Sequence, residues 1–562
     1  MKKSRNILTI IILIVLSLIS SYLLSTNSLS YSYSWLDEAK AVDITDFEHV
    51  YENVDYDIES GIHTPLNDDP WIMFNNINHK YSGVLIKLKQ KADSSIPVKL
   101  YYTQEGSDAL SERNTIEIVI NKGMDTGYIK LPAMSLNIIR LDIDAECIIE
   151  SISLSEGKIA KRALYDNAYA LIFIIKFFII FIVLYFAFLY HKERVSKGSK
   201  VIKGIFINDA SSLSEHRYEL DYIRTLAAIL VIMMHSVIES FAPQVSIGEP
   251  GYLTLKMFLA LSLVCNVLFI MLSGSLLLKP KDETIGQFYK KRLGKVLIPT
   301  ISYYLLYMLQ GYPSEVFKDG LGNGLKEIGL GLLTSRPKYM LHMWFIYAIL
   351  GLYILAPFLR ILIKHINEGQ LLGLIITGFI CDILASTLPY FKLSFGIETP
   401  LSSWMGVFLL GYYITTDHAK KHYRLFMCLG VIGLIVTCLS VYYHPEYLYY
   451  ESNWAPMMWL EGAAVFAFFS YFKKFFGKKN FIVLTIAKYN FSIMLVHVLL
   501  LMKFILPTGW RLQAQYGHLS IFIVMMILVC FILSYVVSVI YDNTAIAAAN
   551  YIYSKIINRN KK

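Results

Sequence analysis

The sequence predicts an all-α polytopic membrane bundle preceded by two further transmembrane helices that flank a β-sandwich. Composition is the first indication, because 55% of the 562 residues are hydrophobic, only 17% are charged and the mean hydropathy is +0.48. The second is a series of apolar stretches long enough to span a bilayer. The third is one long polar region near the amino terminus, in which short stretches alternate as strands do.

Twelve apolar stretches are candidate spans. They lie near residues 7–25, 167–190, 218–240, 253–278, 294–312, 341–363, 371–388, 401–416, 424–443, 455–472, 481–507 and 518–541. The expected organisation is an anchor at 1–26, a β-sandwich at 27–166, a transmembrane helix at 167–190, a basic linker at 191–217, a ten-helix membrane unit at 218–545 and a basic tail at 546–562. A signal peptide is the alternative for the first stretch, but its apolar run is long and its cleavage pattern weak, so we expect a retained anchor.

The distribution of basic residues predicts the orientation of the chain in a cell membrane. With the amino terminus inside, the inner segments carry 28 Lys and Arg residues, whereas the five short outer loops carry six. Positively charged loops stay on the cytoplasmic side. We therefore expect a multi-pass protein with both termini cytoplasmic and residues 27–166 extracytoplasmic. The formal net charge of +9 follows from the same asymmetry and predicts no nucleic-acid partner.

The polar region is expected to form a small antiparallel sandwich. Six stretches alternate between apolar and polar residues: 83–88, 98–102, 116–120, 128–131, 138–143 and 148–154. Its residues Trp71, Tyr101, Tyr102 and Asp69 are candidates for a sugar-contacting patch. Aromatic residues of a small sandwich more often belong to the core, so a role as spacer or assembly module stays open beside glycan binding.

The strongest indication of chemistry is a pair of ionisable residues, Arg224 and His235, inside the third span. Charged and titratable groups are costly at bilayer depth, so their presence there points to function. Eleven residues at 100° each bring both side chains to one face of a helix, roughly 16 Å apart along its axis. A fixed cation and a titratable base would thus mark two depths of one path, which suits a long donor with an anionic head.

Two carboxylates are in helical register with this pair. Asp221 can pair with Arg224, either at a binding site or as a structural ion pair, and Glu239 can orient the imidazole of His235 or reach water. A lone histidine in an apolar helix usually packs, but one in phase with an arginine is a candidate general base. A neutral imidazole can take a proton from a hydroxyl, so a hydroxyl nucleophile with a thioester electrophile would fit.

Further candidates lie in later segments. After the fourth span, the small residues around Ser273 allow close helix approach, and Arg292 and Lys295 at the start of the next helix are the best candidates to bind a nucleotide phosphate beside Arg224. His342 and His497 either line the acceptor side or pack between helices. Trp344 and Tyr347 are expected to form an aromatic belt or helix contacts rather than a sugar platform.

These segments resemble acyltransferase family 3 integral membrane proteins, whose hallmark is an arginine and a histidine with ten residues between them. The segment LDYIRTLAAILVIMMH carries that signature, and four others resemble the family in the expected order: FIMLSGSLLL, RLGKVLIP, HMWFIYAILGLYILAPFLR and KYNFSIMLVHVLLL. Together they cover roughly residues 215–545. The segment HMWFIY is similar to the branch that O-acetylates surface polysaccharides.

The resemblance implies a ten-helix bundle that moves an acyl group, usually acetyl, from cytoplasmic acyl-coenzyme A to a hydroxyl of a cell-envelope carbohydrate. On that basis Arg224, Arg292 and Lys295 hold the phosphates of the donor, acetyl-CoA, and His235 acts as general base with Glu239 beside it. Some relatives carry a soluble esterase-like domain after the membrane unit. We expect acylation here at the bundle itself.

Other partners and functions are constrained by the sequence. Five of the six cysteines fall in spans and Cys147 is alone in the polar region, so we expect no metal site and no disulfide framework. The expected partners are acyl-CoA, an envelope carbohydrate acceptor and the lipid bilayer, and a homo-oligomer stays open. Two rival functions are a transporter or flippase for a lipid-linked glycan and an envelope glycan-binding scaffold. Loss of coenzyme A binding on Arg224→Ala would argue against the first.

Overall fold

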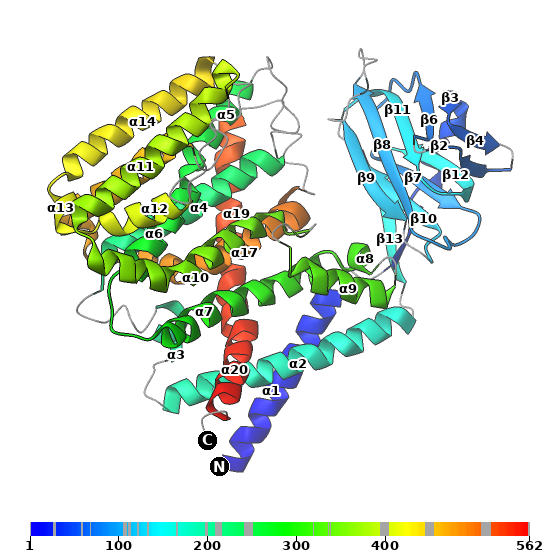
Figure 1. Cartoon of the computed structure of the whole chain (residues 1–562). Helices are drawn as coiled ribbons and strands as arrows, with labels where there is room; N and C mark the ends of the chain where they lie inside the picture. Colours follow the sequence, from blue (N-terminus) through cyan, green and yellow to red (C-terminus); the bar gives the residue numbers. More distant parts are fainter. Residues whose placement is uncertain are drawn as a thin grey trace. The chain divides into compact units, whose positions relative to one another are not determined.

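The computed structural model describes residues 2–25, 30–57, 60–67, 69–104, 110, 114–120, 123–131, 134–164, 167–196, 201–207, 216–240, 251–317, 320–334, 337, 339–393, 404–443, 455–506 and 519–559. The chain divides into two compact units, Met1–Phe181 and Ile182–Lys562. The first is rich in strands and the second is helical (Figure 1). Each unit is described by itself.

The first unit is a β-sandwich attached to two helices, α1 (Lys2–Ser25) and α2 (Asn167–Ser196), the second of which extends into the helical unit. Two short 3₁₀ turns, η2 (Glu38–Lys40) and η3 (Ile44–Asp46), lie between its early strands. The strands are β1 (Ser30–Trp35), β2 (Ala41–Asp43), β3 (Glu48–Glu52), β4 (Val54–Asp57), β5 (Ile62–Pro65), β6 (Trp71–Asn75), β7 (Gly83–Leu88), β8 (Ile96–Gln104), β9 (Thr115–Ile120), β10 (Thr126–Lys130), β11 (Leu136–Ile143), β12 (Cys147–Ser155) and β13 (Ile159–Leu164). All six strands expected from alternation are present, with ends shifted by up to two residues.

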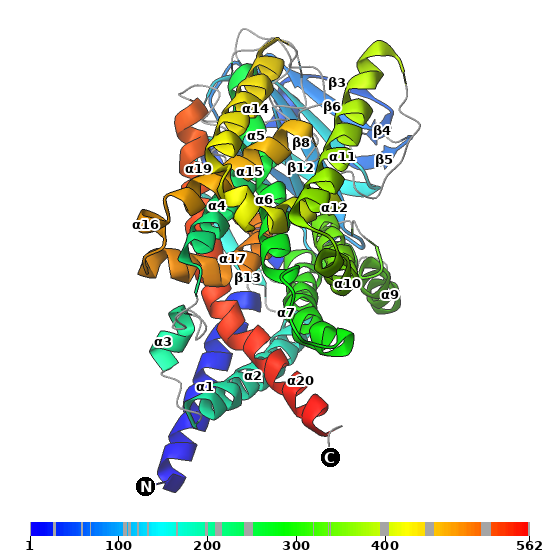
Figure 2. The ribbon, with the colours of Figure 1, turned by 60° about the vertical axis from the view of Figure 1, so that its left-hand side comes forward.

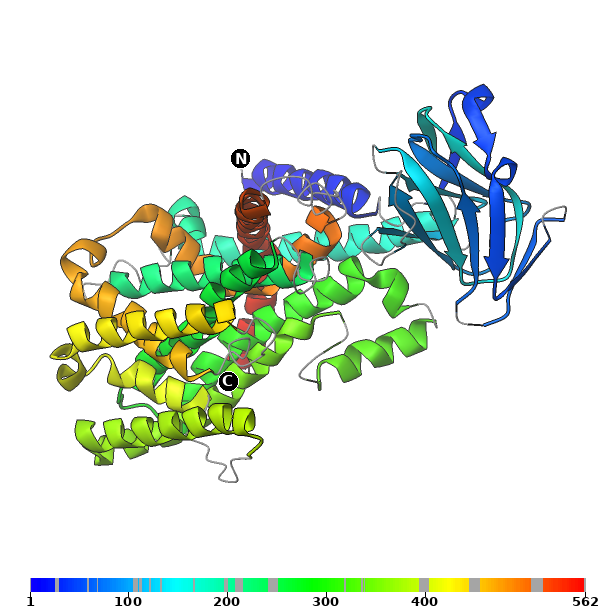
Figure 3. The same ribbon diagram turned by 90° about the horizontal axis from the view of Figure 1, so that it is seen from above.

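The strands form two packed sheets and a ribbon (Figure 3). One sheet has the order β10-β7-β12-β5-β4, with β2 also paired to β12, and the other has the order β3-β6-β11-β8-β9. Inward-pointing residues of the two sheets share a core that includes Phe74 and Leu141 of one sheet and Ile86 of the other. In the ribbon, β1 pairs antiparallel with β13 and so brings together the chain segments that follow α1 and precede α2.

The second unit is a bundle of helices. Its α-helices are α3 (Val201–Phe206), α4 (Tyr218–Ser240), α5 (Tyr252–Ser262), α6 (Val264–Leu277), α7 (Ile285–Leu306), α8 (Pro313–Val316), α9 (Leu321–Gly331), α10 (Trp344–His365), α11 (Glu368–Thr387), α12 (Trp404–Tyr413), α13 (Asp417–Lys420), α14 (Tyr423–Tyr443), α15 (Pro456–Tyr471), α16 (Lys473–Phe476), α17 (Phe481–Leu500), α19 (Leu519–Tyr541) and α20 (Ala547–Arg559). Short 3₁₀ turns are η7 (Leu341–Met343) and η8 (Leu388–Phe391), and π-helical turns are η6 (Tyr307–Gly311), η10 (Leu501–Ile505) and η12 (Asp542–Ile546). Helix α17 packs against both α4 and α19, and α6 packs against α12 and α4 (Figures 1 and 2).

Eight helical stretches of the described residues are long and apolar enough to cross a membrane. They are Ala170–Ser196, Tyr218–Glu239, Tyr252–Leu277, Leu341–His365, Glu368–Thr387, Tyr423–Tyr443, Phe481–Ile505 and Leu519–Ile556. The four other stretches expected to span also lie in helices, of which α12 has 10 residues and α15 has 16. Of the twelve expected spans, the other four therefore remain predictions.

Several helices extend further than the apolar runs suggest. Helix α7 begins at Ile285 because Thr284 and Gln287 form a capping box, in which each side chain accepts a hydrogen bond from the other residue's backbone N–H. The expected linker 191–217 contains the end of α2 and all of α3. The expected tail is helical through Arg559, because the π-helical turn η12 joins α19 to α20 without ending the helix.

Helices α6 and α12 cross at two glycines, as the small residues near Ser273 predict. A Cβ atom added to Gly274 would lie 1.9 Å from the carbonyl oxygen of Phe408, and one added to Gly411 would lie 2.2 Å from that of Met271. Backbone atoms cannot move aside as a flexible side chain can. Only glycine therefore permits this crossing, which holds the wall of the bundle around Ser273 in place.

We expect Gly274→Val to destabilise the bundle strongly, because the added carbons overlap the backbone of Phe408 and overpacking costs about 1–3 kcal/mol or more. Size-exclusion chromatography and thermal unfolding of the detergent-solubilised protein measure the effect. Gly351→Ala in α10 is the control, because nothing lies within 4 Å of its added Cβ. Equal behaviour of the two variants would contradict the close crossing.

Candidate active site

Helix α4 carries Arg224 and His235, and each residue lines a separate cavity of the helical unit. The eleven-residue separation puts them three helical turns apart, as the sequence predicts. We call the cavity at Arg224 the cation cavity and the cavity at His235 the histidine cavity. The first is defined by its basic residues and the second by its imidazoles.

The cation cavity has a volume of about 240 Å³. Arg224 of α4 meets Arg292 and Lys295 of α7 there. Its other polar lining residues are Ser273, Tyr353 and Asn490. The three cations expected to bind a phosphate group are therefore brought together, although 44 residues of sequence separate the end of α4 at Ser240 from the start of α7 at Ile285. Three clustered positive charges favour a ligand with more than one negative charge.

The charges in the cation cavity are not equally compensated. Arg224 forms an ion pair with Asp221, whose other carboxylate oxygen lies 2.6 Å from Nε2 of His216. The side chain of Asp221 is only 4% exposed, so this ion pair also contributes to the structure. By contrast, Nε of Arg292 is buried and has no hydrogen-bond partner among the described residues. Arg292 is thus better prepared than Arg224 to bind an incoming anion.

The histidine cavity has a volume of about 480 Å³ and contains three imidazoles from three segments of the chain. The ring of His235 lies 5.0 Å from that of His497 and 5.9 Å from that of His342, and the last two are 5.7 Å apart, centroid to centroid. Oε1 of Glu239 lies 3.6 Å from Nδ1 of His235, too far for a hydrogen bond. A small movement of the carboxylate would bring them into contact.

Backbone carbonyls hold the other two imidazoles. Nδ1 of His497 lies 2.8 Å from the carbonyl oxygen of Met494, and Nε2 of His342 lies 3.3 Å from that of Leu495. Tyr307 strengthens this region, because its hydroxyl donates to the carbonyl of Leu495 and accepts from the backbone N–H of Leu499. His342 and His497 are therefore fixed beside His235. His235 itself is not held by a hydrogen bond at Nδ1 from any described residue, because Glu239 lies 3.6 Å from this nitrogen.

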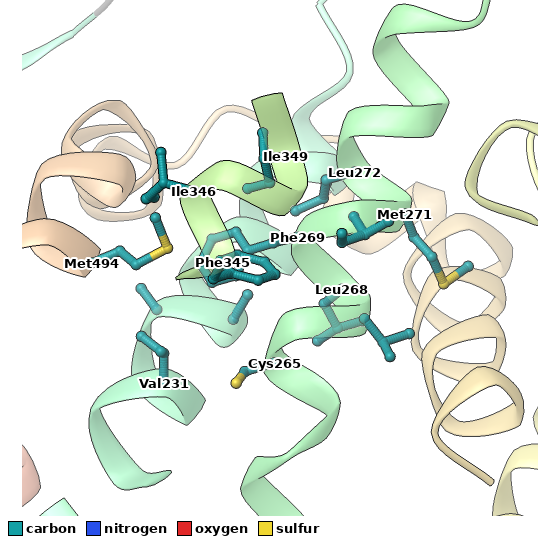
Figure 4. Packing of buried hydrophobic residues seen from close by; sticks show 14 of the residues in the cluster. Val231, Cys265, Leu268, Phe269, Met271, Leu272, Phe345, Ile346, Ile349 and Met494 are labelled. Atoms are coloured by element: carbon teal, nitrogen blue, oxygen red, sulfur yellow. The ribbon is translucent and has the colours of Figure 1, made fainter. Parts of the chain in front are cut away.

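An apolar partition lies between the two cavities. Phe269 lines the cation cavity and Phe345 lines the histidine cavity, and the two rings contact each other with centroids 6.1 Å apart (Figure 4). Both side chains are buried. A ligand arm that passes between the two cavities at this contact would displace these rings.

Sequence comparison identifies the membrane unit. The family model described as "Acyltransferase domain", that of acyltransferase family 3, matches residues 217–537, more than half of the chain. The chain belongs to acyltransferase family 3. It is therefore a membrane acyltransferase, and the resemblance of residues 215–545 is confirmed. No curated protein matches the chain.

The structure of this acyltransferase family 3 member brings together most of the residues singled out from the sequence. Arg224, Ser273, Arg292 and Lys295 line one cavity, and His235, His342, Trp344 and His497 line the other. Tyr347 lines neither; its hydroxyl donates to the carbonyl of Leu332 and its ring packs between helices, as expected for a helix contact.

Several polar cavity residues of this acyltransferase were not among the site residues expected from the sequence, although Tyr353 belongs to one of the family-like segments. Lys256 and Asn266 line the histidine cavity, and Tyr353 and Asn490 line the cation cavity. Asn266 was detectable in principle, because it is a buried amide in the middle of an apolar run. Among the described residues, no group of His, Cys, Asp or Glu is arranged to hold a metal ion.

The structure places only part of the suggested sugar-contacting residues of the β-sandwich together. Tyr102 is buried in the core, 2% exposed, and does not belong to a surface patch. Trp71 and Tyr101 lie on the opposite face, each about 5 Å from the guanidinium of Arg140, which also pairs with Asp69. The aromatic rings thus pack against a cation of their own sheet.

Proposed function

We propose that the protein transfers an acyl group, most simply acetyl, from acyl-coenzyme A to a hydroxyl of a cell-envelope or exported polysaccharide. The single observation that carries this proposal is the arrangement on α4, with clustered cations at one cavity and clustered imidazoles at another, roughly 16 Å apart along the helix. Coenzyme A has its phosphates at one end of a flexible arm and its thioester at the other. The phosphate end suits the cation cavity, and the thioester end suits the histidine cavity.

In this proposal Arg224, Arg292 and Lys295 bind the phosphates, and His235 is the general base, oriented by Glu239. The acceptor oxygen attacks the thioester carbonyl carbon as His235 takes the hydroxyl proton. The carbon–sulfur bond then breaks, and the thiolate of coenzyme A takes up that proton. The products are an ester and free coenzyme A, so electrons and atoms balance without a further reactant.

The proposal assigns the end of α4 that bears Arg224 to the cytoplasmic side, where acyl-CoA is available. Both termini are then cytoplasmic and the β-sandwich is extracytoplasmic, in agreement with the excess of basic residues in the inner segments. The main test is mass spectrometry of the envelope polysaccharide from cells with and without this protein. An acetyl-sized mass difference supports the proposal, and identical masses would contradict it.

The apolar partition leads to a specific prediction. We expect Phe345→Leu to raise the release of free coenzyme A from acetyl-CoA several-fold without an acceptor, because a smaller side chain between the cavities lets water reach the thioester. Thiol release by the purified protein measures this. Phe379→Leu is the control, because Phe379 packs on Trp459 away from both cavities. Unchanged thiol release and unchanged acyl transfer in Phe345→Leu would exclude the partition from the donor path.

A further inference from the structure

We infer that His342 and His497 are hydrogen-bond acceptors for the hydroxyl groups of the acyl acceptor, and that the histidine cavity therefore selects a polyhydroxyl compound over a simple alcohol. This inference rests on the proposed function, because it assumes that the acceptor enters the histidine cavity. It assigns a role to two residues whose function the sequence left open.

The hydrogen-bonding state of each ring follows from its carbonyl partner. A carbonyl oxygen only accepts, so Nδ1 of His497, 2.8 Å from the carbonyl of Met494, carries the hydrogen. By the same reasoning Nε2 of His342 carries the hydrogen that points to the carbonyl of Leu495. A neutral imidazole has one donor and one acceptor nitrogen. Nε2 of His497 and Nδ1 of His342 are therefore the acceptors.

Both acceptor nitrogens lack a hydrogen-bond partner among the described residues and belong to rings that line the histidine cavity. Each nitrogen is buried. The residue His497 is 1% exposed. A buried polar atom that lacks a partner costs about 1–3 kcal/mol, so a ligand that donates to both nitrogens gains relative to one that donates to neither.

His235 adds a third hydrogen-bond-accepting nitrogen to the cavity and no donor. When Glu239 closes the 3.6 Å gap to Nδ1 of His235, that nitrogen becomes the donor to the carboxylate, and Nε2 remains as base. The three imidazoles then offer the sugar only nitrogens that accept hydrogen bonds.

Lys256 of α5 and Asn266 of α6 also line the cavity, and both side chains carry hydrogen-bond donors. A sugar hydroxyl both donates and accepts, and neighbouring hydroxyls on one ring can reach two acceptor nitrogens at once. In an alcohol with a single hydroxyl, the one O–H hydrogen points to His235, so the acceptor nitrogens of His342 and His497 both stay unpaired. The distribution of donors and acceptors therefore matches a carbohydrate and disfavours a monohydroxyl acceptor.

The first test is a direct measurement of the ring states in the purified full-length protein. With ¹⁵N-labelled histidine, the nitrogen chemical shifts distinguish the two neutral tautomers from the charged ring, and the spectra of His342→Asn and His497→Gln assign the signals. We expect hydrogen on Nδ1 of His497 and on Nε2 of His342. The opposite tautomer, or a charged ring, at either residue would overturn the inference. This result does not depend on whether the protein transfers acyl groups.

The second test uses substitutions that keep or remove the acceptor at one position. The amide oxygen of glutamine lies near the place of Nε2, and that of asparagine near the place of Nδ1. We therefore expect His497→Gln to retain more transfer than His497→Asn, and His342→Asn to retain more than His342→Gln. The difference should appear mainly in the KM for the acceptor. The same loss for both amides at each position would indicate a merely structural role and would overturn the inference.

The probes are cis-1,2-cyclohexanediol and cyclohexanol, with acetyl-CoA as donor and ester formation as the readout. We expect transfer to the diol at a higher kcat/KM than to cyclohexanol, and a reduced preference in His497→Asn. Ester formation at equal kcat/KM from both alcohols would overturn the polyol assignment while leaving the proposed acyltransfer intact. No ester from either alcohol would also overturn the assignment. A failure of the proposed function itself is recognised separately, by unchanged polysaccharide masses.

Discussion

Replacing His235 with alanine is expected to abolish acyl transfer while the protein still inserts and folds. His235 is the imidazole of the histidine cavity that lies on α4 in phase with Arg224, and it is the one with a carboxylate, Glu239, near Nδ1. A positioned general base contributes about 10²–10⁴-fold in rate. We therefore expect kcat to fall by that factor, with little change in donor affinity, when thiol release and ester formation are measured together.

The control for this prediction is His365→Ala. His365 lies at the end of α10, is exposed, and its ring contacts only the carbonyl of Ile361 among the described residues. Its removal should leave both turnover and folding unchanged. Normal turnover of the His235→Ala variant would exclude His235 from catalysis and shift the role of base to His342 or His497.

The sequence allows the signature on α4 to be predicted for a simple reason. A straight helix turns by 100° per residue, so residues 224 and 235 share a face wherever the helix packs. The basic residues Arg292 and Lys295 follow from the same reasoning, because they precede the apolar run of their helix on the membrane side that the sequence assigns to Arg224. Local periodicity and the alternation of loops between the two sides of a membrane are both readable from one sequence.

The histidine cavity was only partly predictable. His235, His342 and His497 come from α4, η7 and α17, and their contact depends on which helices are neighbours. Hydrophobic periodicity gives the buried face of a helix but not its partner. The apolar partition of Phe269 and Phe345 could not be foreseen for the same reason, since each looks like an ordinary core residue of its own helix.

The fold shows the same division between local and long-range information. The alternation of apolar and polar residues located β7, β8, β9, β10, β11 and β12, because side chains of a half-buried strand alternate between two faces. It did not reveal that β1 pairs with β13, since these strands are more than 120 residues apart. The apolar runs marked the spans but did not reveal the helix ends, because α2 continues to Ser196 and α20 to Arg559 beyond those runs.

Replacing Arg292 with alanine is expected to weaken donor binding more specifically than replacing Arg224. Nε of Arg292 is buried and has no partner among the described residues, so its removal breaks no ion pair seen there. A charge-assisted hydrogen bond contributes about 1.5–3 kcal/mol, equivalent to roughly 10- to 100-fold in Kd. Calorimetric titration of the purified protein with coenzyme A should show a loss of this size, with the KM for the acceptor unchanged.

Arg224→Ala is a less specific test of the same site, because it leaves the buried carboxylate of Asp221 without its arginine. The double variant with Asp221→Asn removes both charges and separates donor binding from folding. Arg424→Ala is the matched control, since Arg424 is exposed and its guanidinium contacts Tyr471 far along the chain from the cation cavity. If Arg292→Ala and Arg424→Ala bound coenzyme A equally well, the cation cavity would not be the phosphate site, and a donor path along α4 would lose its starting point.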